Sequence, residues 1–149
     1  EEAFPAFLKI IEESELPEGT HILLQQHPGA KEKNLDVNQI PAHLQERFII
    51  STQTTDEALL RAERVFYYQT SMGPLVALAG IPAIQIGHEP FEDILIRSNI
   101  APAVTSADAL KKALQSRPKI NAAQLNQRLG IQEDWPVRLE HALGLVPGF

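Results

Sequence analysis

The chain has 149 residues and no cysteine, which excludes disulfides, thiol chemistry and thiolate metal sites. The formal net charge is −6 and the Lys and Arg residues are scattered, which argues against a nucleic-acid partner because phosphate neutralisation needs clustered basic residues. No apolar run approaches the ~20 residues that a membrane span needs. We expect one cytoplasmic domain over residues 1–149 without a transmembrane segment, and we leave open a peripheral attachment of the full-length protein to the inner membrane.

The chain opens with a helical pattern. Phe4, Phe7, Leu8 and Ile11 recur at a spacing that places them on one face of a helix over residues 1–15. Five short runs rich in β-branched or aromatic residues follow, and most are apolar throughout, as in strands covered on both faces. We predict strands at HILLQ (21–25), RFIIS (47–51), RVFYY (64–68), PAIQIG (82–87) and APAVT (101–105).

Helical patterns separate the predicted strands. Thr55 is the expected N-cap of a helix in 54–63, and Ser106 that of a helix in 106–116, because a hydroxyl oxygen can accept from the free N–H groups of a first turn. Further helices are predicted over 72–80, ending on Gly80, over 90–99, beginning at Pro90, and in the tail, about 119–149.

Strands recur about every 20 residues, with helices between them, which is typical of βα units. The pattern predicts an α/β fold: a doubly wound, parallel, Rossmann-like sheet with helices on both faces and a core over about 20–115. Such a sheet normally begins with a strand that lies at its centre, whereas the first predicted element here is a helix. We therefore expect a fragment of a two-domain protein whose first strand lies upstream.

Four stretches resemble the C-terminal, donor-binding half of GT-B-type glycosyltransferases and of the related UDP-N-acetylglucosamine 2-epimerases. In that family a strand ends in a His-Pro turn, a later strand leads to a Ser/Gly-rich turn, a helix closes before Gly-x-Pro, and a further helix follows. The resemblance covers about two thirds of the chain. The stretches are QQHPGA (25–30), DEALLRAERVFYYQTSMG (56–73), ALAGIPAIQIG (77–87) and VTSADALKKAL (104–114).

The resemblance implies that Gln69, Thr70, Ser71 and Gly73 lie where the family's turn meets the phosphate of the donor. A turn of small residues at the carboxyl end of a strand also offers free N–H groups to an anion. The Thr70 and Ser71 hydroxyls would add donors, and Gly73 would let a ligand approach the backbone. The alternative is a tight strand–helix connection in which Ser71 or Thr70 caps the helix.

Three more candidates follow predicted strands, at the edge where α/β proteins collect ligands. His27 can contact a sugar or a phosphate, because imidazole both donates and accepts; alternatively it fixes the turn at Pro28 and Gly29. His88 and Glu89 can form an acid–base pair, or they belong to a solvated loop. The histidines have no metal-binding spacing, so we expect no metal site, and the catalytic residues stay unassigned.

These observations lead us to expect the nucleotide-sugar-binding domain of a transferase that moves a sugar to a glycan or lipid acceptor. The nucleoside diphosphate sugar would be a substrate, and no cofactor is expected. An N-terminal domain would complete the cleft, so the fragment alone is expected to be inactive. Two alternatives stay open, a sugar-nucleotide epimerase domain and a non-catalytic binding module; Leu75 favours the second, because it stands where the family usually has a ribose-binding Glu. A homodimer also stays open.

Overall fold

The computed structural model describes residues 3–25, 37–68 and 73–116. Within these ranges helices alternate with short parallel strands, so the protein belongs to the α/β class, as the sequence predicts. The helices predicted in the tail, about 119–149, lie outside the described residues.

All five predicted strands are present, in the predicted order. Each is shorter than the apolar run that contains it. Some flanking residues still bond to the neighbouring strand; for example, the Gly87 N–H donates to the Val104 carbonyl at 3.2 Å. Their bounds are β1 (Ile22–Leu24), β2 (Phe48–Ile50), β3 (Val65–Tyr67), β4 (Ala83–Ile86) and β5 (Ala103–Val104).

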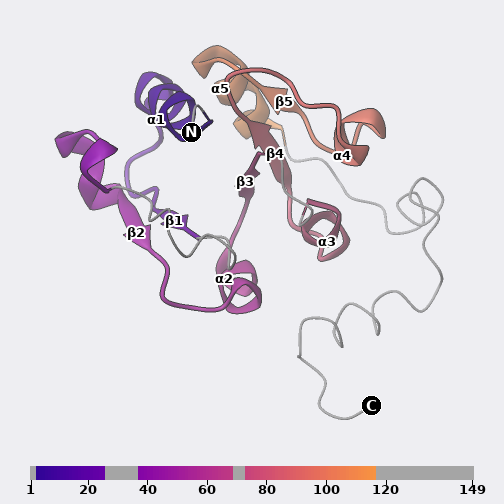
Figure 1. Ribbon diagram of the computed structural model, residues 1–149, viewed down its shortest axis with the longest axis horizontal. Coiled ribbons are helices and arrows are strands. Elements are labelled where there is room, and N and C mark those ends of the chain that lie inside the picture. Colours follow the sequence, from indigo (N-terminus) through magenta and orange to yellow (C-terminus); the bar gives the residue numbers. More distant parts are fainter. Residues whose placement is uncertain (1–2, 26–36, 69–72, 117–149) are drawn as a thin grey trace, which may run out of the picture.

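The strands form two small parallel sheets (Figure 1). The first pairs β1 with β2, and the second has the order β3-β4-β5. Ile22 pairs with Phe48 in the first sheet, and Val65 pairs with Ala83 in the second. Among the described strands, β1 bonds to β2 and β3 bonds to β4, and nothing joins β1 to β3. The parallel strands are consistent with the predicted Rossmann-like α/β fold.

The described residues contain five α-helices and two short 3-10 helices: α1 precedes the first strand, α5 follows the last, and the others lie between strands. Helices α1 and α5 lie side by side, as Figure 1 shows. The second half of the long polar connection between β1 and β2 forms the two 3-10 helices, and residues 26–36 lie outside the described part. The bounds are α1 (Ala3–Ser14), η1 (Val37–Gln39), η2 (Ala42–Arg47), α2 (Thr55–Arg61), α3 (Gly73–Leu78), α4 (Ile94–Arg97) and α5 (Ala107–Gln115).

Two helices begin at other residues than the sequence predicts, whereas the predicted N-cap of α5, Ser106, is confirmed. Helix α2 has Thr54 as its N-cap instead of Thr55, and the Thr54 N–H donates to the Glu57 carboxylate at 3.0 Å. Helix α4 begins after Asp93 instead of at Pro90, because the Asp93 carboxylate accepts from the first free N–H groups of that helix. Ser106 caps α5 by accepting from the Ala109 N–H at 3.2 Å.

Two helix ends are closed by residues in the left-handed region. Gly80, with a φ of 78°, follows α3, and its N–H donates to the Ala77 carbonyl at 3.0 Å. Asn99, with a φ of 54°, does the same after α4, donating to Ile96 at 3.0 Å. Glycine and asparagine tolerate this conformation best, which explains why the helices stop there.

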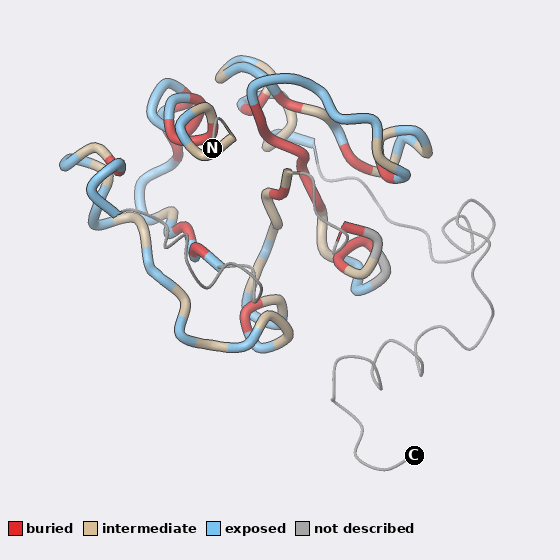
Figure 2. The backbone as a smooth tube through the Cα atoms, in the orientation of Figure 1, coloured by how far each residue is buried: buried red, intermediate tan, exposed pale blue. Residues whose placement is uncertain are grey.

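The core has two layers, one on each face of the β3-β4-β5 sheet. Residues alternate along the strands, so Phe66 and Ile84 point into the layer under α1 and α5, while Tyr67 and Ala83 point into the layer under α3 and α4. Figure 2 shows that β4 is buried along its length. The largest fully buried side chains are Ile11, Ile84, Leu95, Leu110 and Gln85.

One layer of the core holds both sheets together. The Phe7 ring of α1 lies 6.4 Å from the ring of Phe48 on β2 and 6.0 Å from the ring of Phe66 on β3. Ile22 and Leu24 of β1 belong to the same buried cluster. Helix α1 therefore packs on both sheets at once.

Candidate functional site

The carboxyl ends of β3, β4 and β5 meet at one edge, because the three strands are parallel and adjacent. Tyr68 follows β3, the segment Gly87–Glu89 follows β4, and Ser106 follows β5 after one residue. Open α/β sheets collect ligands at this edge. We call the group of Tyr68, Gly87, His88 and Glu89 the carboxyl-edge site.

The centre of the carboxyl-edge site is a contact between an aromatic ring and a glycine. A Cβ atom placed on Gly87 would lie 2.5 Å from two carbons of the Tyr68 ring, so only glycine allows the ring to lie this close to the backbone. The His88 ring packs on the same tyrosine at 5.5 Å between centroids, inclined by 60°. The sequence analysis did not single out Gly87, although a glycine at a strand's carboxyl end is itself a signal of close approach.

The predicted pair of His88 and Glu89 is present. The His88 Nε2 and Glu89 Oε1 atoms are 3.5 Å apart, and the side chains are 35% and 68% exposed. The imidazole therefore packs on a tyrosine ring and lies beside a carboxylate, and about a third of the side chain is exposed. Such a group can donate to a phosphate or hydroxyl oxygen, and the carboxylate can accept from a hydroxyl.

A buried glutamine holds the loop that carries this pair. Gln85 on β4 is 1% exposed, and its Nε2 donates to the Phe91 carbonyl at 2.7 Å and to the Asp93 carboxylate at 3.1 Å. Its Oε1 accepts from the Phe91 N–H at 2.8 Å. The loop after β4 is therefore fixed at its far end, two residues beyond Glu89.

A buried phenol lies below the same loop. Tyr67 is 7% exposed, and within the described part of the chain its hydroxyl makes no hydrogen bond of good geometry. Burial raises the pKa of Tyr67 well above its usual range, and the nearby Asp93 carboxylate raises it further although the two groups are not aligned for a hydrogen bond. The phenol therefore stays protonated under ordinary conditions.

Replacing Tyr67 by phenylalanine should leave the free energy of unfolding at pH 7 unchanged or raise it by up to about 1 kcal/mol, because an unpartnered buried hydroxyl is removed. Above a pH of about 10 the parent chain should lose stability, since the phenol ionises in the unfolded state while the folded state, with its raised pKa, resists ionisation. Denaturant unfolding at pH 7 and in this alkaline range measures both effects. An equal alkaline loss in the Tyr67→Phe variant would contradict this role of Tyr67.

The other sequence-predicted site residues divide into two groups. His27, Gln69, Thr70 and Ser71 lie outside the described residues. Gly73 is described: it is the first residue of α3, and a Cβ atom there would lie 3.0 Å from the Leu95 Cδ1 atom. Close packing of α3 on α4 is thus one reason for glycine at this position.

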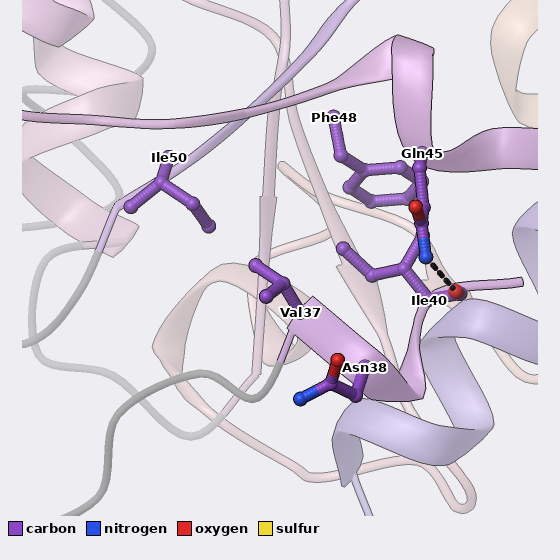
Figure 3. Close-up of a pocket in the computed structure, with 6 residues that line it drawn as sticks. All are labelled: Val37, Asn38, Ile40, Gln45, Phe48 and Ile50. Carbon is purple, nitrogen blue, oxygen red and sulfur yellow. Dashed lines mark hydrogen bonds between the residues drawn. The ribbon is translucent and has the colours of Figure 1, made fainter. Parts of the chain in front are cut away.

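A separate hollow of about 150 Å³ lies beside β2 (Figure 3). The Gln45 amide at its wall donates to the Ile40 carbonyl at 3.2 Å. Among the described residues no charged side chain lines it, so it offers no cation to a phosphate. Its lining residues are Val37, Asn38, Ile40, Gln45, Phe48 and Ile50.

The residues described by the structure contain no group of three or more His, Asp or Glu side chains placed to hold a metal ion. None of the helices in these ranges has the length and apolar character needed to cross a membrane. Comparisons with family models, with curated proteins and with solved structures found no match to this chain.

Proposed function

We propose that the chain is the donor-binding domain of a GT-B-type glycosyltransferase and that it binds a nucleoside diphosphate sugar at the carboxyl-edge site. The observation that carries the proposal is the meeting of Tyr68 and His88 at the ends of two neighbouring parallel strands, with Glu89 beside them. The order of helices and strands supports it, because it is the order of the family that the sequence resembles.

Each side chain of the site has a role that its chemistry allows. His88, whose side chain is partly exposed, donates a hydrogen bond to a phosphate or sugar oxygen. Glu89 keeps the imidazole oriented and, being largely exposed, can accept from a sugar or ribose hydroxyl. Tyr68 fixes the position of the His88 ring by packing against it.

The transfer reaction needs a second domain in this proposal. GT-B enzymes hold donor and acceptor between two domains, so this chain supplies the donor side of the cleft, and a glycan or lipid acceptor lies on the other side. The carboxyl-edge site contains one His–carboxylate pair. We therefore assign it binding and orientation of the donor, and expect no turnover by this domain alone.

Leu75 favours a second candidate function, a binding module without catalytic activity. It is half-buried on α3, at the position where the family usually carries a glutamate that binds the ribose. A leucine cannot accept hydrogen bonds from a ribose diol. A module of this kind would bind phosphate alone as well as it binds any nucleotide.

Calorimetric titration of the chain with UDP, GDP, CDP and inorganic phosphate tests the proposal. We expect one diphosphate to bind, and His88→Ala to weaken it about tenfold or more, since a hydrogen bond to a charged group is worth roughly 1.5–3 kcal/mol. His43→Ala is the matched control, because His43 also pairs with a carboxylate, that of Glu12 at 3.2 Å, on another part of the surface.

The outcomes separate the two candidates. Binding of one nucleotide that depends on His88 and not on His43 supports the donor-binding domain. Equal binding of phosphate and of all three nucleotides supports the non-catalytic module. If no ligand binds at millimolar concentration to the natural full-length chain, both candidates are wrong.

A further inference from the structure

Within the described part of the chain, no strand pairs with the edge of β1 that faces away from β2. The Leu24 carbonyl accepts from the Ser51 N–H at 2.9 Å, so the backbone groups of Leu24 point towards β2. In a parallel strand the N–H and C=O groups of one residue point to the same side, and successive residues alternate. The N–H and C=O of Leu23 therefore point to the opposite edge, where no described strand pairs with β1.

Strand β3 has the same kind of free edge. The Val65 N–H donates to the Pro82 carbonyl at 2.9 Å, so the backbone groups of Val65 point towards β4. Those of Phe66 point the other way, and no described strand pairs with β3 on that side. A strand edge with unpaired N–H and C=O groups is a template for pairing with a further strand.

The two free edges belong to one core. Ile22, Leu24 and Phe66 pack in the same buried cluster, and Phe7 of α1 contacts both sheets. Figure 1 shows the two sheets side by side, with β1 and β3 as their inner strands. We call the place between β1 and β3 the central position.

The faces occupied by the helices show the direction in which each connection steps. In right-handed crossovers, connections that step in opposite directions across a sheet lie on opposite faces. Helices α3 and α4, which step from β3 to β5, pack on the layer of Tyr67 and Ala83, and Leu59 of α2 packs there too. Helix α1 packs on the other layer. The connection that contains α1 therefore runs across the sheet in the opposite direction, from the β3 side towards β2, and it reaches β1 from the side of β3.

We propose that the central position holds one further parallel strand, which belongs to the same polypeptide and leads directly into α1. The sheet then runs β2-β1-strand-β3-β4-β5 and is continuous. The connection from β1 to β2 agrees with this order, because it steps in the same direction as α1 and its Leu44 packs on the same layer. The added strand bonds to the backbone of Leu23 on one side and of Phe66 on the other, and it is apolar because it is covered on both faces.

Amide hydrogen exchange measured by NMR tests the proposal, on this chain and on the natural full-length chain that contains it. The amides of Leu23 and Phe66 point to the central position, whereas those of Leu24 and Tyr67 point to paired strands and serve as internal controls. In the full-length chain we expect exchange at Leu23 and Phe66 to slow at least about tenfold relative to the controls, with the protein monomeric. An unchanged ratio would overturn the proposal.

Two further measurements test whether the added strand comes from a second copy of the chain and whether it bonds to β1. If the protection grows with protein concentration and sedimentation shows a dimer, the strand comes from a second copy and the proposal is wrong. In the full-length chain, Leu23→Pro removes the N–H that points to the central position, and Leu23→Ala removes only the side chain. The proline variant should lose the slowed exchange at Phe66 and the alanine variant should keep it; equal behaviour of the two would also overturn the proposal.

Discussion

Replacing Leu110 by alanine should lower the free energy of unfolding by about 2–5 kcal/mol. Leu110 is completely buried in α5, where it packs in the cluster that contains Ile84 and Ile86 of β4. The variant loses the transfer free energy of the removed carbon atoms and leaves a cavity beneath a helix that contacts β5 and α1. Denaturant unfolding with the circular dichroism signal as readout gives the loss.

The neighbouring residue provides the control for Leu110. Lys111 is exposed on the same helix, so Lys111→Ala should change the free energy of unfolding by no more than about 0.5 kcal/mol. A loss below about 1 kcal/mol for Leu110→Ala would mean that α5 does not pack on the sheet as the structure has it.

Replacing Gln85 by glutamate should destabilise the fold by roughly 3 kcal/mol or more near pH 7. The introduced carboxylate is buried, lies next to Asp93, and can no longer donate to the Phe91 carbonyl. Burial and the neighbouring carboxylate both raise the folded-state pKa of the introduced group. Its penalty is therefore absent below its unfolded pKa of about 4.3 and grows as the pH rises through the higher folded value.

The matched control for Gln85→Glu is Gln45→Glu, the same substitution at an exposed position. Its amide also donates to a backbone carbonyl, that of Ile40, but the residue is exposed, so Gln45→Glu should cost less than about 1 kcal/mol. Unfolding measured at pH 7 and at a pH of about 4 compares the two variants. Equal small losses at both sites would show that Gln85 does not fix the loop after β4.

The strands were predictable because their signal is local. β4 is buried on both faces and β3 is at least partly buried on both, so VFY and AIQI read as apolar runs with one glutamine. The order of helices and strands follows from such runs. Ser106 and Gly80 were predictable for the same reason, since a cap depends on one side chain or one backbone angle.

The features that the sequence did not reveal depend on distant contacts. Pro90 alone would allow a helix to begin at that residue. The Gln85 side chain, which precedes Asp93 by eight residues, bonds to the segment before α4 and keeps it out of a helical conformation, so the helix begins only after Asp93. The β3-β4-β5 order of the second sheet depends on which strand edges meet in space, and no local pattern records that.

The candidate site was predictable in part. His88 and Glu89 stand out in the sequence because they follow a strand, and the structure brings them together. Gly87 was not singled out, since its importance lies in a contact with Tyr68, about 20 residues earlier in the chain. For Tyr68, which closes a predicted strand, the sequence favoured packing in the core over stacking on the base of a ligand.

The most direct test of the carboxyl-edge site is a map of amide chemical-shift changes by NMR as the nucleotide selected by calorimetry is added. We expect the largest changes at Tyr68, Gly87, His88 and Glu89, and we expect His88→Ala to abolish them without disturbing the rest of the spectrum. Changes centred instead on the hollow beside β2, at Val37 and Ile50, would contradict the proposed site and place the ligand elsewhere.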